Sequence, residues 1–483
     1  MSLRGLREAI RSGERSAVDV CRETLTRVGA LNPSLNAFNT VAADRAMARA
    51  EAIDRDRNRW REAPLAGIPV AVKDNICTRD LRTTASSRML EHFVPPFDAT
   101  AVERLEAAGA VVIGKTNCDE FAMGSSNETS AFGPVHNPWS LERSPGGTSG
   151  GSAAAVSARI TPVALGSDTG GSIRQPASLC GVVGLKPSYG RVSRYGLIAH
   201  GSSLDQIGPI TTSAYDAAAM LGVLAGADEA DSTSAPEAVP DYTAALTGDI
   251  RGTRIGVPRA LTEQGVDPDV ARANGEALAL LASRGAALVD IELPHARFAT
   301  PVYYLVSTAE ASSNLARYDG VRYGFRIDAP ADLRSMYART RARGFGREVK
   351  RRIMLGTYVL SAGYYDAYYL KAQQVRTLIL RDYDRAFERV DLVAMPTSPV
   401  PAFRLGERIA DPLQMYLIDI FTVSANLTGL PAISIPCGFT GDALPIGMQL
   451  TGRRFDEATL LRVADAFERD TTWSTRQPPT SNR

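Results

Sequence analysis

The middle of the chain reads Ser144-Pro-Gly-Gly-Thr-Ser-Gly-Gly-Ser152 and then Gly166-Ser-Asp-Thr-Gly-Gly-Ser-Ile-Arg-Gln-Pro176. Between them, the sequence predicts a helix of small residues over 152–158 and a strand over 162–165. The strand would deliver the chain to residues 168–172, where paired glycines let several backbone N–H groups converge beside a serine. Convergent N–H groups next to a nucleophile are the material of an oxyanion hole.

A serine nucleophile needs a base, and this chain has only four histidines. Of its 54 basic residues only five are lysines, namely Lys73, Lys115, Lys186, Lys350 and Lys371. Lys73 ends the apolar run 68–72, which we interpret as a buried strand. A partly desolvated lysine at a strand end can lose its proton and serve as the base, which arginine cannot do. From these letters alone, a glycine-rich structural turn with serines capping helices stays open as the alternative.

Two other motifs match known patterns but lack the required context. Residues 109–116, Gly-Ala-Val-Val-Ile-Gly-Lys-Thr, fit the phosphate-loop pattern, yet the four residues between the glycines predict a strand rather than a turn. Residues 147–151 contain GxSxG, but residues 136–145 before them read as a loop, whereas a nucleophile elbow needs a strand there. We therefore favour neither a nucleotide-binding loop nor an α/β-hydrolase elbow.

The paired stretches GGTSGGSAAA and GSDTGGSIRQPA, with IPVAVKDN upstream, resemble the amidase signature family from about residue 5 to residue 470. The resemblance implies a Ser–cis-Ser–Lys triad in which Ser172 is the acylated nucleophile and Lys73 is the base. The relay between them falls on Thr148, and we expect a cis peptide between Gly147 and Thr148. The oxyanion would lie against the backbone N–H groups of the loop before the nucleophile, those of Thr169, Gly170 and Gly171.

The relay position departs from the family pattern, because the family has serine where this chain has Thr148. Threonine keeps a hydroxyl that can both donate and accept a hydrogen bond, so the relay chemistry survives. Its β-methyl group restricts χ1 and must fit beside a crowded backbone. Ser149 is the neighbouring alternative, although we expect its side chain to point elsewhere.

The rest of the chain alternates helical and strand patterns, which predicts an α/β fold. We expect helices over 3–29 and 40–60, the first ended by Asn32-Pro33, and one near 98–108. Further strands are predicted at 110–113, 254–257, 287–293, 392–395, 432–436 and 446–450. Together with the resemblance, this indicates a single large amidase-type domain whose mixed, twisted sheet is covered by helices on both faces. Its predicted parts are an N-terminal helical segment packed on the core (1–60), the catalytic domain (61–470) and a polar tail (471–483).

Composition excludes several classes of protein. With 44% hydrophobic and 22% charged residues, the 483-residue chain is not disordered, and a net charge of +1 argues against nucleic-acid binding, DNA included, as its main task. The N-terminus lacks the apolar core of a signal peptide, and no apolar run approaches the ~20 residues of a membrane span. Five scattered cysteines, without a CxxC, predict reduced thiols in a cytoplasmic protein, and we expect no metal site.

Three further stretches resemble one group within the family, the A subunits of the glutamyl-tRNA(Gln)/aspartyl-tRNA(Asn) amidotransferases. They are residues 309–320, residues 350–358 with 364–369, and residues 419–431. This resemblance implies a glutaminase subunit of a heterotrimer with B and C subunits. Ammonia from glutamine would pass to a partner subunit that uses ATP and Mg to activate the mischarged glutamyl group, and that partner would hold most of the tRNA. No cofactor is expected in this chain, and the choice between Glu-tRNA(Gln) and Asp-tRNA(Asn) stays open.

Free glutamine carries an α-carboxylate and an α-ammonium, so its pocket needs one charge of each sign. By resemblance, Arg352 would bind the carboxylate and Asp419 the ammonium, with Tyr303 lining the pocket. Arg351 and Tyr304 are the near alternatives. A loop is expected to close over the site through Met123, Gly124 and Ser125.

Two other functions are weighed against this one. A stand-alone amidase of small amides with the same Ser-Thr-Lys triad would need neither the charged pocket nor partners. A non-catalytic scaffold that keeps the fold is less consistent with the sequence, because the lysine, hydroxyl and serine positions are all intact.

Overall fold

The computed structural model describes residues 2–262, 265–409 and 411–479, and within these ranges it forms one mixed sheet of 11 strands. The order across the sheet is β1 (Phe38–Val41), β3 (Val111–Thr116), β2 (Pro69–Lys73), β4 (Val163–Asp168), β6 (Gln206–Thr211), β5 (Val183–Lys186), β10 (Ala432–Phe439), β11 (Pro445–Gly452), β9 (Leu392–Pro396), β7 (Arg254–Val257) and β8 (Ala287–Asp290). β2 runs parallel to both β3 and β4, whereas β6, β5, β10, β11 and β9 follow in antiparallel pairs. The predicted mixed α/β architecture is confirmed.

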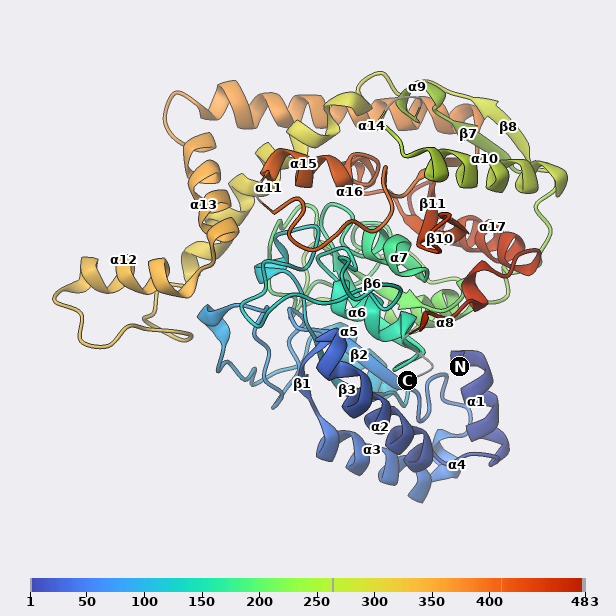
Figure 1. The fold of residues 1–483 in the computed structure, drawn as a ribbon, viewed down its shortest axis with the longest axis horizontal. Helices are drawn as coiled ribbons and strands as arrows, with labels where there is room; N and C mark the ends of the chain where they lie inside the picture. Colours follow the sequence, from blue (N-terminus) through green and yellow to red (C-terminus); the bar gives the residue numbers. More distant parts are fainter. Residues whose placement is uncertain (1, 263–264, 410, 480–483) are drawn as a thin grey trace.

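Helices cover both faces of the sheet, as predicted (Figure 1). Strand residues alternate between two cores, so that Val70 and Val72 face one and Ala71 faces the other. The first core is shared by α1 (Leu3–Ser12), α5 (Thr100–Ala107), α8 (Ala214–Leu224), α10 (Pro268–Ser283) and α17 (Glu457–Arg469). The second is shared by α2 (Ala17–Leu35), α3 (Ala43–Arg55), α6 (Gly150–Ser157) and α7 (Arg174–Cys180). Near β9, a third core holds α11 (Ala299–Asn314), α14 (Lys371–Arg389) and α16 (Val423–Thr428).

The N-terminal helices differ from the prediction at their ends. The first predicted helix is split, because Gly13 ends α1 in the left-handed region (φ 81°) and the Ser16 side chain caps α2. The expectation that Asn32-Pro33 ends the helix was wrong, since α2 continues to Leu35. A proline so close to the C-terminus of a helix removes a single backbone hydrogen bond. The second predicted helix is α3 followed by the short α4 (Arg57–Trp60).

Three strands, β1, β5 and β6, were not predicted. β6 contains Gly208 and Pro209, which are uncommon inside strands. The glycine is needed there, because a Cβ on Gly208 would lie 2.2 Å from the carbonyl oxygen of Leu185. Residues 480–483 of the predicted tail lie outside the described residues, while Trp473 packs against Phe439 with a ring-centroid distance of 5.9 Å.

One part of the chain projects from the body. Between α11 and α13 (Arg347–Val359), a loop and α12 (Leu333–Gly344) extend away from the sheet (Figure 1). Other short elements include α9 (Arg259–Thr262), a π-helical turn at Tyr365–Leu370, α15 (Pro412–Tyr416) and several 3-10 turns. Within the described ranges, no helix is long and apolar enough to cross a membrane.

Candidate active site

The candidate site lies where the carboxyl ends of parallel strands meet. Lys73 is the last residue of β2 and Asp168 the last of β4, and the register pairs Val72 with Leu165. In α/β sheets this edge is the usual position of ligand sites. The predicted position of Lys73 at a strand end is confirmed.

The amine of Lys73 is completely buried among hydroxyl groups. Its Nζ lies 2.6 Å from Thr148 Oγ1, 2.9 Å from Ser149 Oγ and 2.9 Å from Ser167 Oγ, with the Ser167 carbonyl oxygen at 3.2 Å. A charged ammonium would donate three hydrogen bonds to these oxygens. A neutral amine keeps two donors and gains a lone pair, so one hydroxyl must then donate to Nζ. The arrangement therefore suits an amine that exchanges a proton with a hydroxyl.

Burial lowers the pKa of Lys73 to about 8, although the acidic side chains of Asp119 and Asp168 oppose the shift. Burial also lowers the pKa of Lys115 to about 8 and that of Lys186 to about 7. A depressed pKa therefore does not by itself mark the base. The distinction is geometric, because the hydroxyls around the Lys73 amine belong to the two motif stretches.

This pKa predicts a pH dependence for amide hydrolysis. With Lys73 acting as a base, the active form is unprotonated, and its share grows as pH rises through about 8. We expect kcat to increase about tenfold from pH 6 to 7, about fivefold from pH 7 to 8, and to level off above. The measurement is kcat for propionamide, because glutamine adds the titration of its own binding groups. A flat profile between pH 6.5 and 8.5 would contradict a neutral-lysine mechanism.

The two motif stretches meet at the loop before α6. The peptide between Gly147 and Thr148 is cis, as predicted, and the N–H of Ser149 donates to the carbonyl oxygen of Ser172 (3.1 Å). The expectation that the Ser149 side chain points elsewhere was wrong, since its Oγ contacts Lys73. The reason is the position of Ser149 directly before α6, where its hydroxyl also donates to the Ser167 carbonyl oxygen (3.1 Å) at the end of β4.

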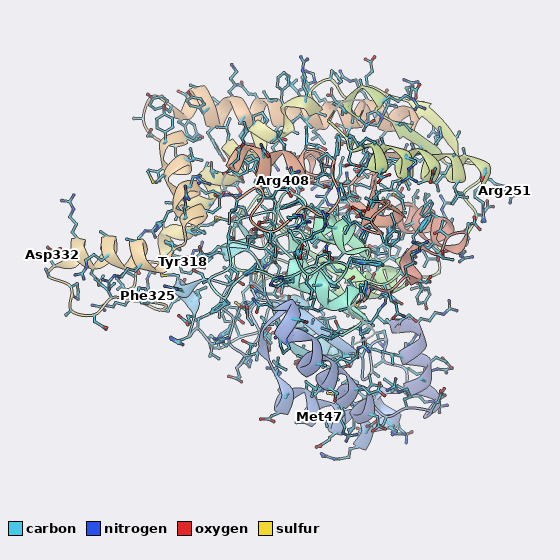
Figure 2. All side chains as sticks on the ribbon, viewed as in Figure 1. Met47, Arg251, Tyr318, Phe325, Asp332 and Arg408 are labelled. Atoms are coloured by element: carbon cyan, nitrogen blue, oxygen red, sulfur yellow. The ribbon has the colours of Figure 1, made fainter. Side chains whose placement is uncertain are left out.

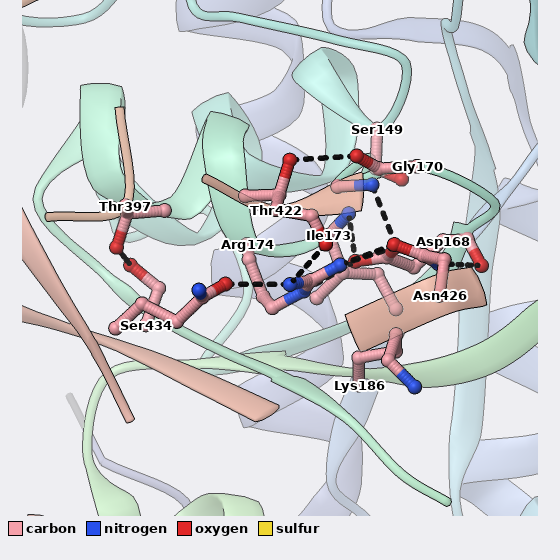
Figure 3. A network of polar contacts seen from close by, with 12 residues as sticks. Ser149, Asp168, Gly170, Ile173, Arg174, Lys186, Thr397, Thr422, Asn426 and Ser434 are labelled. Carbon is pink, nitrogen blue, oxygen red and sulfur yellow. Dashed lines mark hydrogen bonds and ion pairs between the residues drawn. The ribbon is translucent and has the colours of Figure 1, made fainter. Parts of the chain in front are cut away.

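The turn that carries Ser172 is held by the carboxylate of Asp168. This carboxylate accepts hydrogen bonds from the N–H groups of Gly171 (2.8 Å) and Ile173 (3.2 Å) and pairs with Arg174 (Figure 3). Burial alone would raise the pKa of Asp168, but the Arg174 guanidinium holds it well below its usual range. Ser172 is 8% exposed, so the turn presents its side chain at the edge of the buried network.

Gly171 does not provide the free oxyanion donor that was predicted, because its N–H is already bonded to Asp168. The glycine is needed for another reason. Its φ of 136° is unfavourable for other residues, and a Cβ there would lie 2.3 Å from Thr422 Oγ1. Among the described residues, the N–H groups of Thr169 and Gly170 find no hydrogen-bond partner, so these two predicted donors are available.

A buried arginine network supports this turn and was missed at the sequence level. The Arg174 guanidinium donates to Gln449 Oε1 (2.5 Å), Asn426 Oδ1 (2.6 Å) and the Thr422 carbonyl oxygen (3.1 Å) (Figure 3). Arg174 and Asp168 are both fully buried. The motif did contain a signal for this ion pair. Asp168 lies four residues before Ser172 and Arg174 two residues after it, so both charges belong to the same turn.

Arg352 is 2% exposed and lies beside a stacked pair of tyrosine rings. Its guanidinium carbon is 5.3 Å from the ring centroid of Tyr304 and 5.6 Å from that of Tyr416, while Nε donates to Glu348 (2.9 Å). Burial opposes the charge, but the carboxylate of Glu348 outweighs it and keeps the pKa of Arg352 above its usual range. No partner for the terminal Nη atoms is found in the described part of the chain, so they can receive an anion.

Asp419 supplies the opposite charge. Its Oδ2 accepts a hydrogen bond from Ser125 Oγ (2.6 Å), and its buried Oδ1 has no partner among the described residues. Burial raises the pKa of Asp419 to about 7, against the hydrogen bond from Ser125 and the charge of Arg352. Thr422 Oγ1 contacts the carbonyl oxygens of Asp419 (3.0 Å) and Gly170 (2.6 Å), and so links Asp419 to the turn of Ser172.

The other predicted pocket residues surround these groups. A Cβ on Gly170 would lie 2.6 Å from the ring of Tyr303, so that ring packs directly on the loop before Ser172. A cavity of about 370 Å³ is lined by Gly124, Ser125, Arg352 and ten other residues, and this size is adequate for a small substrate. Tyr303, Asp419 and Ser172 do not line it, but Ser125 connects it to Asp419 through its hydrogen bond. Met123 does not line the cavity but is fully buried, and its carbonyl oxygen accepts a hydrogen bond (3.2 Å) from Thr129, which does line it.

Arg351 and Tyr304, the alternatives to Arg352 and Tyr303 as glutamine-binding residues, lie in different surroundings. Arg351 also lines the cavity, but it is half-exposed and paired with Glu348 (2.5 Å). Tyr304 stacks on Tyr416 with a centroid distance of 3.8 Å. Of the two arginines, Arg352 is the one whose guanidinium is both buried and free at its terminal atoms.

Neither the phosphate-loop pattern nor the GxSxG pattern has the backbone structure that its function requires. Residues 111–116 of the phosphate-loop pattern form strand β3 rather than a turn. Residues 136–145, before the GxSxG pattern, contain isolated bridges instead of a strand. All five cysteines are free, as predicted, and all five are buried. Within the described ranges, no group of three or more metal-ligating side chains is found.

Comparison with known proteins agrees with the motifs. The Amidase family model matches residues 19–461. The chain is 58% identical over 471 residues to the A subunit of the glutamyl-tRNA(Gln) amidotransferase of Chloroflexus aggregans (97% of this chain, 96% of that one). It is 55% identical over 477 residues to the same subunit of Geobacter metallireducens (99% and 98%).

Solved structures show the same relationship. The A subunit of the glutamyl-tRNA(Gln) amidotransferase of Thermotoga maritima is 45% identical, with a TM-score of 0.79 over 94% of this chain and 92% of that one. The peptide amidase of Stenotrophomonas maltophilia is 32% identical, with a TM-score of 0.83 over 99% and 98%. The resemblance predicted from the paired glycine-rich stretches is confirmed, and the chain belongs to the amidase family.

Proposed function

We propose that this chain is the glutaminase subunit of a Glu-tRNA(Gln) amidotransferase. The observation that carries the proposal is a pair of opposite buried charges: Arg352, which lines the cavity, and Asp419, which Thr422 links to the turn of Ser172. Free glutamine presents the complementary pair of charges on its α-carbon. Relatives 55% and 58% identical over almost the whole chain bear the name of the A subunit of this enzyme, which supports the same assignment.

The chemistry begins with neutral Lys73. As Ser172 Oγ attacks the side-chain amide carbon of glutamine, its proton passes to Thr148, whose own hydroxyl proton moves to Lys73 Nζ. The developing oxyanion lies against the N–H groups of Thr169 and Gly170. The relay then returns a proton to the leaving nitrogen, ammonia departs, and water releases glutamate from the acyl-enzyme.

The pocket residues orient the substrate for that attack. Arg352 would bind the α-carboxylate through its free Nη atoms, and Asp419 the α-ammonium through its unpartnered Oδ1. The ring of Tyr303 would form the wall next to Gly170. Met123, Gly124 and Ser125 would close the cavity.

The ammonia would be used by partners. We propose a cytoplasmic heterotrimer with B and C subunits, in which a partner uses ATP and Mg to activate the mischarged glutamyl-tRNA(Gln), and possible service of Asp-tRNA(Asn) is left open. This chain itself would carry no cofactor, and the partner would hold most of the tRNA. The relatives are named as one subunit of an amidotransferase, which supports a multisubunit enzyme.

The test is ammonia release from glutamine and from propionamide, measured with and without co-expressed partners, with Ser172→Ala as the blank. Glutamine turnover that rises on addition of partners, ATP and mischarged tRNA is expected. Rapid cleavage of propionamide by the lone chain, without a preference for glutamine, would instead indicate a stand-alone amidase with the same triad.

Replacing Arg352 tests the pocket within the same assay. We expect Arg352→Leu to raise the KM for glutamine about 100-fold, because the carboxylate loses a buried charged partner, and to leave propionamide hydrolysis nearly unchanged. Arg351→Leu is the matched control, since Arg351 lines the same cavity but is paired with Glu348. A larger effect of the Arg351 variant would move carboxylate binding to that residue.

A further inference from the structure

The segment that projects from the body is strongly basic. Residues 321–347, here named the arm, contain seven arginines and two aspartates, a net charge of +5 in a chain whose total is +1. The rest of the chain is therefore net acidic. Six of the seven arginines are exposed: Arg322, Arg326, Arg334, Arg339, Arg343 and Arg347. Figure 2 shows the arm extending beyond the labelled Tyr318 and Phe325 to Asp332 at its tip.

Most of this charge is not neutralised within the protein. Arg322 has a carboxylate at 3.9 Å, but the other five exposed arginines form no ion pair with the described residues. One of the two arm acids, Asp332, is engaged as the N-cap of α12, where it accepts from the Ser335 N–H (2.6 Å). Arg339 and Arg343 are spaced four residues apart on α12, so their like charges destabilise the helix. Arg343 is favourably placed in the last turn of α12, but none of the six exposed arginines donates a side-chain hydrogen bond to another described residue, and this points to an external anion.

The arm also exposes aromatic rings among its arginines. Tyr323 is 39% and Tyr337 37% exposed, and Tyr337 lies on α12 between Arg334 and Arg341. Guanidinium groups bind phosphate oxygens in a fork, and exposed rings can stack on unpaired bases. We propose that the arm contacts the phosphate backbone of the tRNA substrate, so that this chain shares RNA binding with its partners. The inference rests on the proposed function and deepens it.

The base of the arm is fixed to the body next to the glutamine cavity. Arg341 donates to the carbonyl oxygens of Leu315 (2.8 Å) and Tyr318 (3.0 Å). The N–H of Gly346 donates to the Glu120 carboxylate (2.8 Å), and Phe345 packs on Phe121 (5.6 Å between centroids). Glu120 lines the same cavity as Arg352. RNA bound to the arm would therefore be joined to the pocket wall by a short, packed connection.

The test uses the complete complex with its B and C subunits and a fluorescent tRNA(Gln) transcript. Binding is measured by anisotropy over a range of salt concentrations for the wild type and for R334E/R339E/R343E. We expect the dissociation constant of the variant to rise at least about tenfold at 0.1 M salt, and the salt slope to fall by about 2 to 3. The matched control is R55E/R61E/R389E, which reverses three exposed arginines outside the arm that form no ion pair with the described residues, and it should bind like the wild type.

Two further readouts separate the outcomes. Glutamine hydrolysis without tRNA and complex assembly by gel filtration should be unchanged in the arm variant. Unchanged affinity and salt slope would overturn the proposal, as would loss of the B or C subunit, which would make the arm a docking site for an acidic protein. A wild-type complex that binds no tRNA at all would instead overturn the proposed function, and the arm proposal with it.

Discussion

Lys73→Arg is expected to lower kcat for glutamine by about 1,000-fold or more. The variant keeps the positive charge, but arginine stays protonated at any pH a protein tolerates and cannot accept the proton of Ser172. Removal of a positioned general base costs about 10²- to 10⁴-fold. The measurement is steady-state ammonia release by the full complex at pH 8, where about half of the Lys73 side chains are neutral in the wild type.

The buried position makes a second variant necessary, because the larger guanidinium has to fit where the amine contacts three side-chain oxygens. Lys73→Met has no charge and a similar length, and it should be equally inactive. Lys350→Arg is the matched control, since Lys350 is exposed on α13, and it should keep wild-type turnover. Melting temperatures establish that each variant is folded. Wild-type turnover by Lys73→Arg would show that Lys73 is not the base.

Much of this geometry could be predicted because its signal is local. The run Ile68–Val72 is apolar and β-branched, so β2 and the place of Lys73 at its end followed from the sequence. The loop before Ser172 was predicted from its paired glycines and serine. The ends of β2 and β4 are each determined by residues close together in the chain. The resemblance to the amidase family over the same stretches then indicated which residues are the nucleophile, the relay and the base.

What the sequence could not show depends on contacts between distant segments. The partners of Arg174 lie about 250 residues further along, at Thr422 and Asn426, and nothing near Arg174 identifies them. The N–H of Gly171 was expected to be free. In the structure the turn folds back and brings the Asp168 carboxylate within hydrogen-bond distance of it, and the order of residues alone does not show this. β6 was missed because its glycine and proline disfavour a strand, whereas tertiary packing decides its conformation.

Thr148 and Ser149 test the relay most directly, because both hydroxyls touch the amine of Lys73. Thr148 Oγ1 is the nearer, at 2.6 Å against 2.9 Å. The Ser149 hydroxyl has one proton, and it already donates that proton to the Ser167 carbonyl oxygen (3.1 Å). No other partner of Thr148 Oγ1 is found among the described residues. The Thr148 proton is therefore the one free to move to Nζ.

We accordingly expect Thr148→Ala to lower kcat about 1,000-fold and Thr148→Ser to keep most activity, since serine preserves the hydroxyl. Ser149→Ala, the matched control one residue away, should cost about tenfold or less, because it removes a support of Lys73 without interrupting the proton path. The measurement is kcat for glutamine together with the pH profile. If Ser149→Ala were the more damaging change, the relay would pass through Ser149. The Ser149 hydroxyl contacts the Lys73 amine, so Ser149→Ala should change the pKa of Lys73 and thereby shift the pH at which kcat rises. Thr148→Ser keeps the hydroxyl that contacts the amine and should leave that pH unchanged.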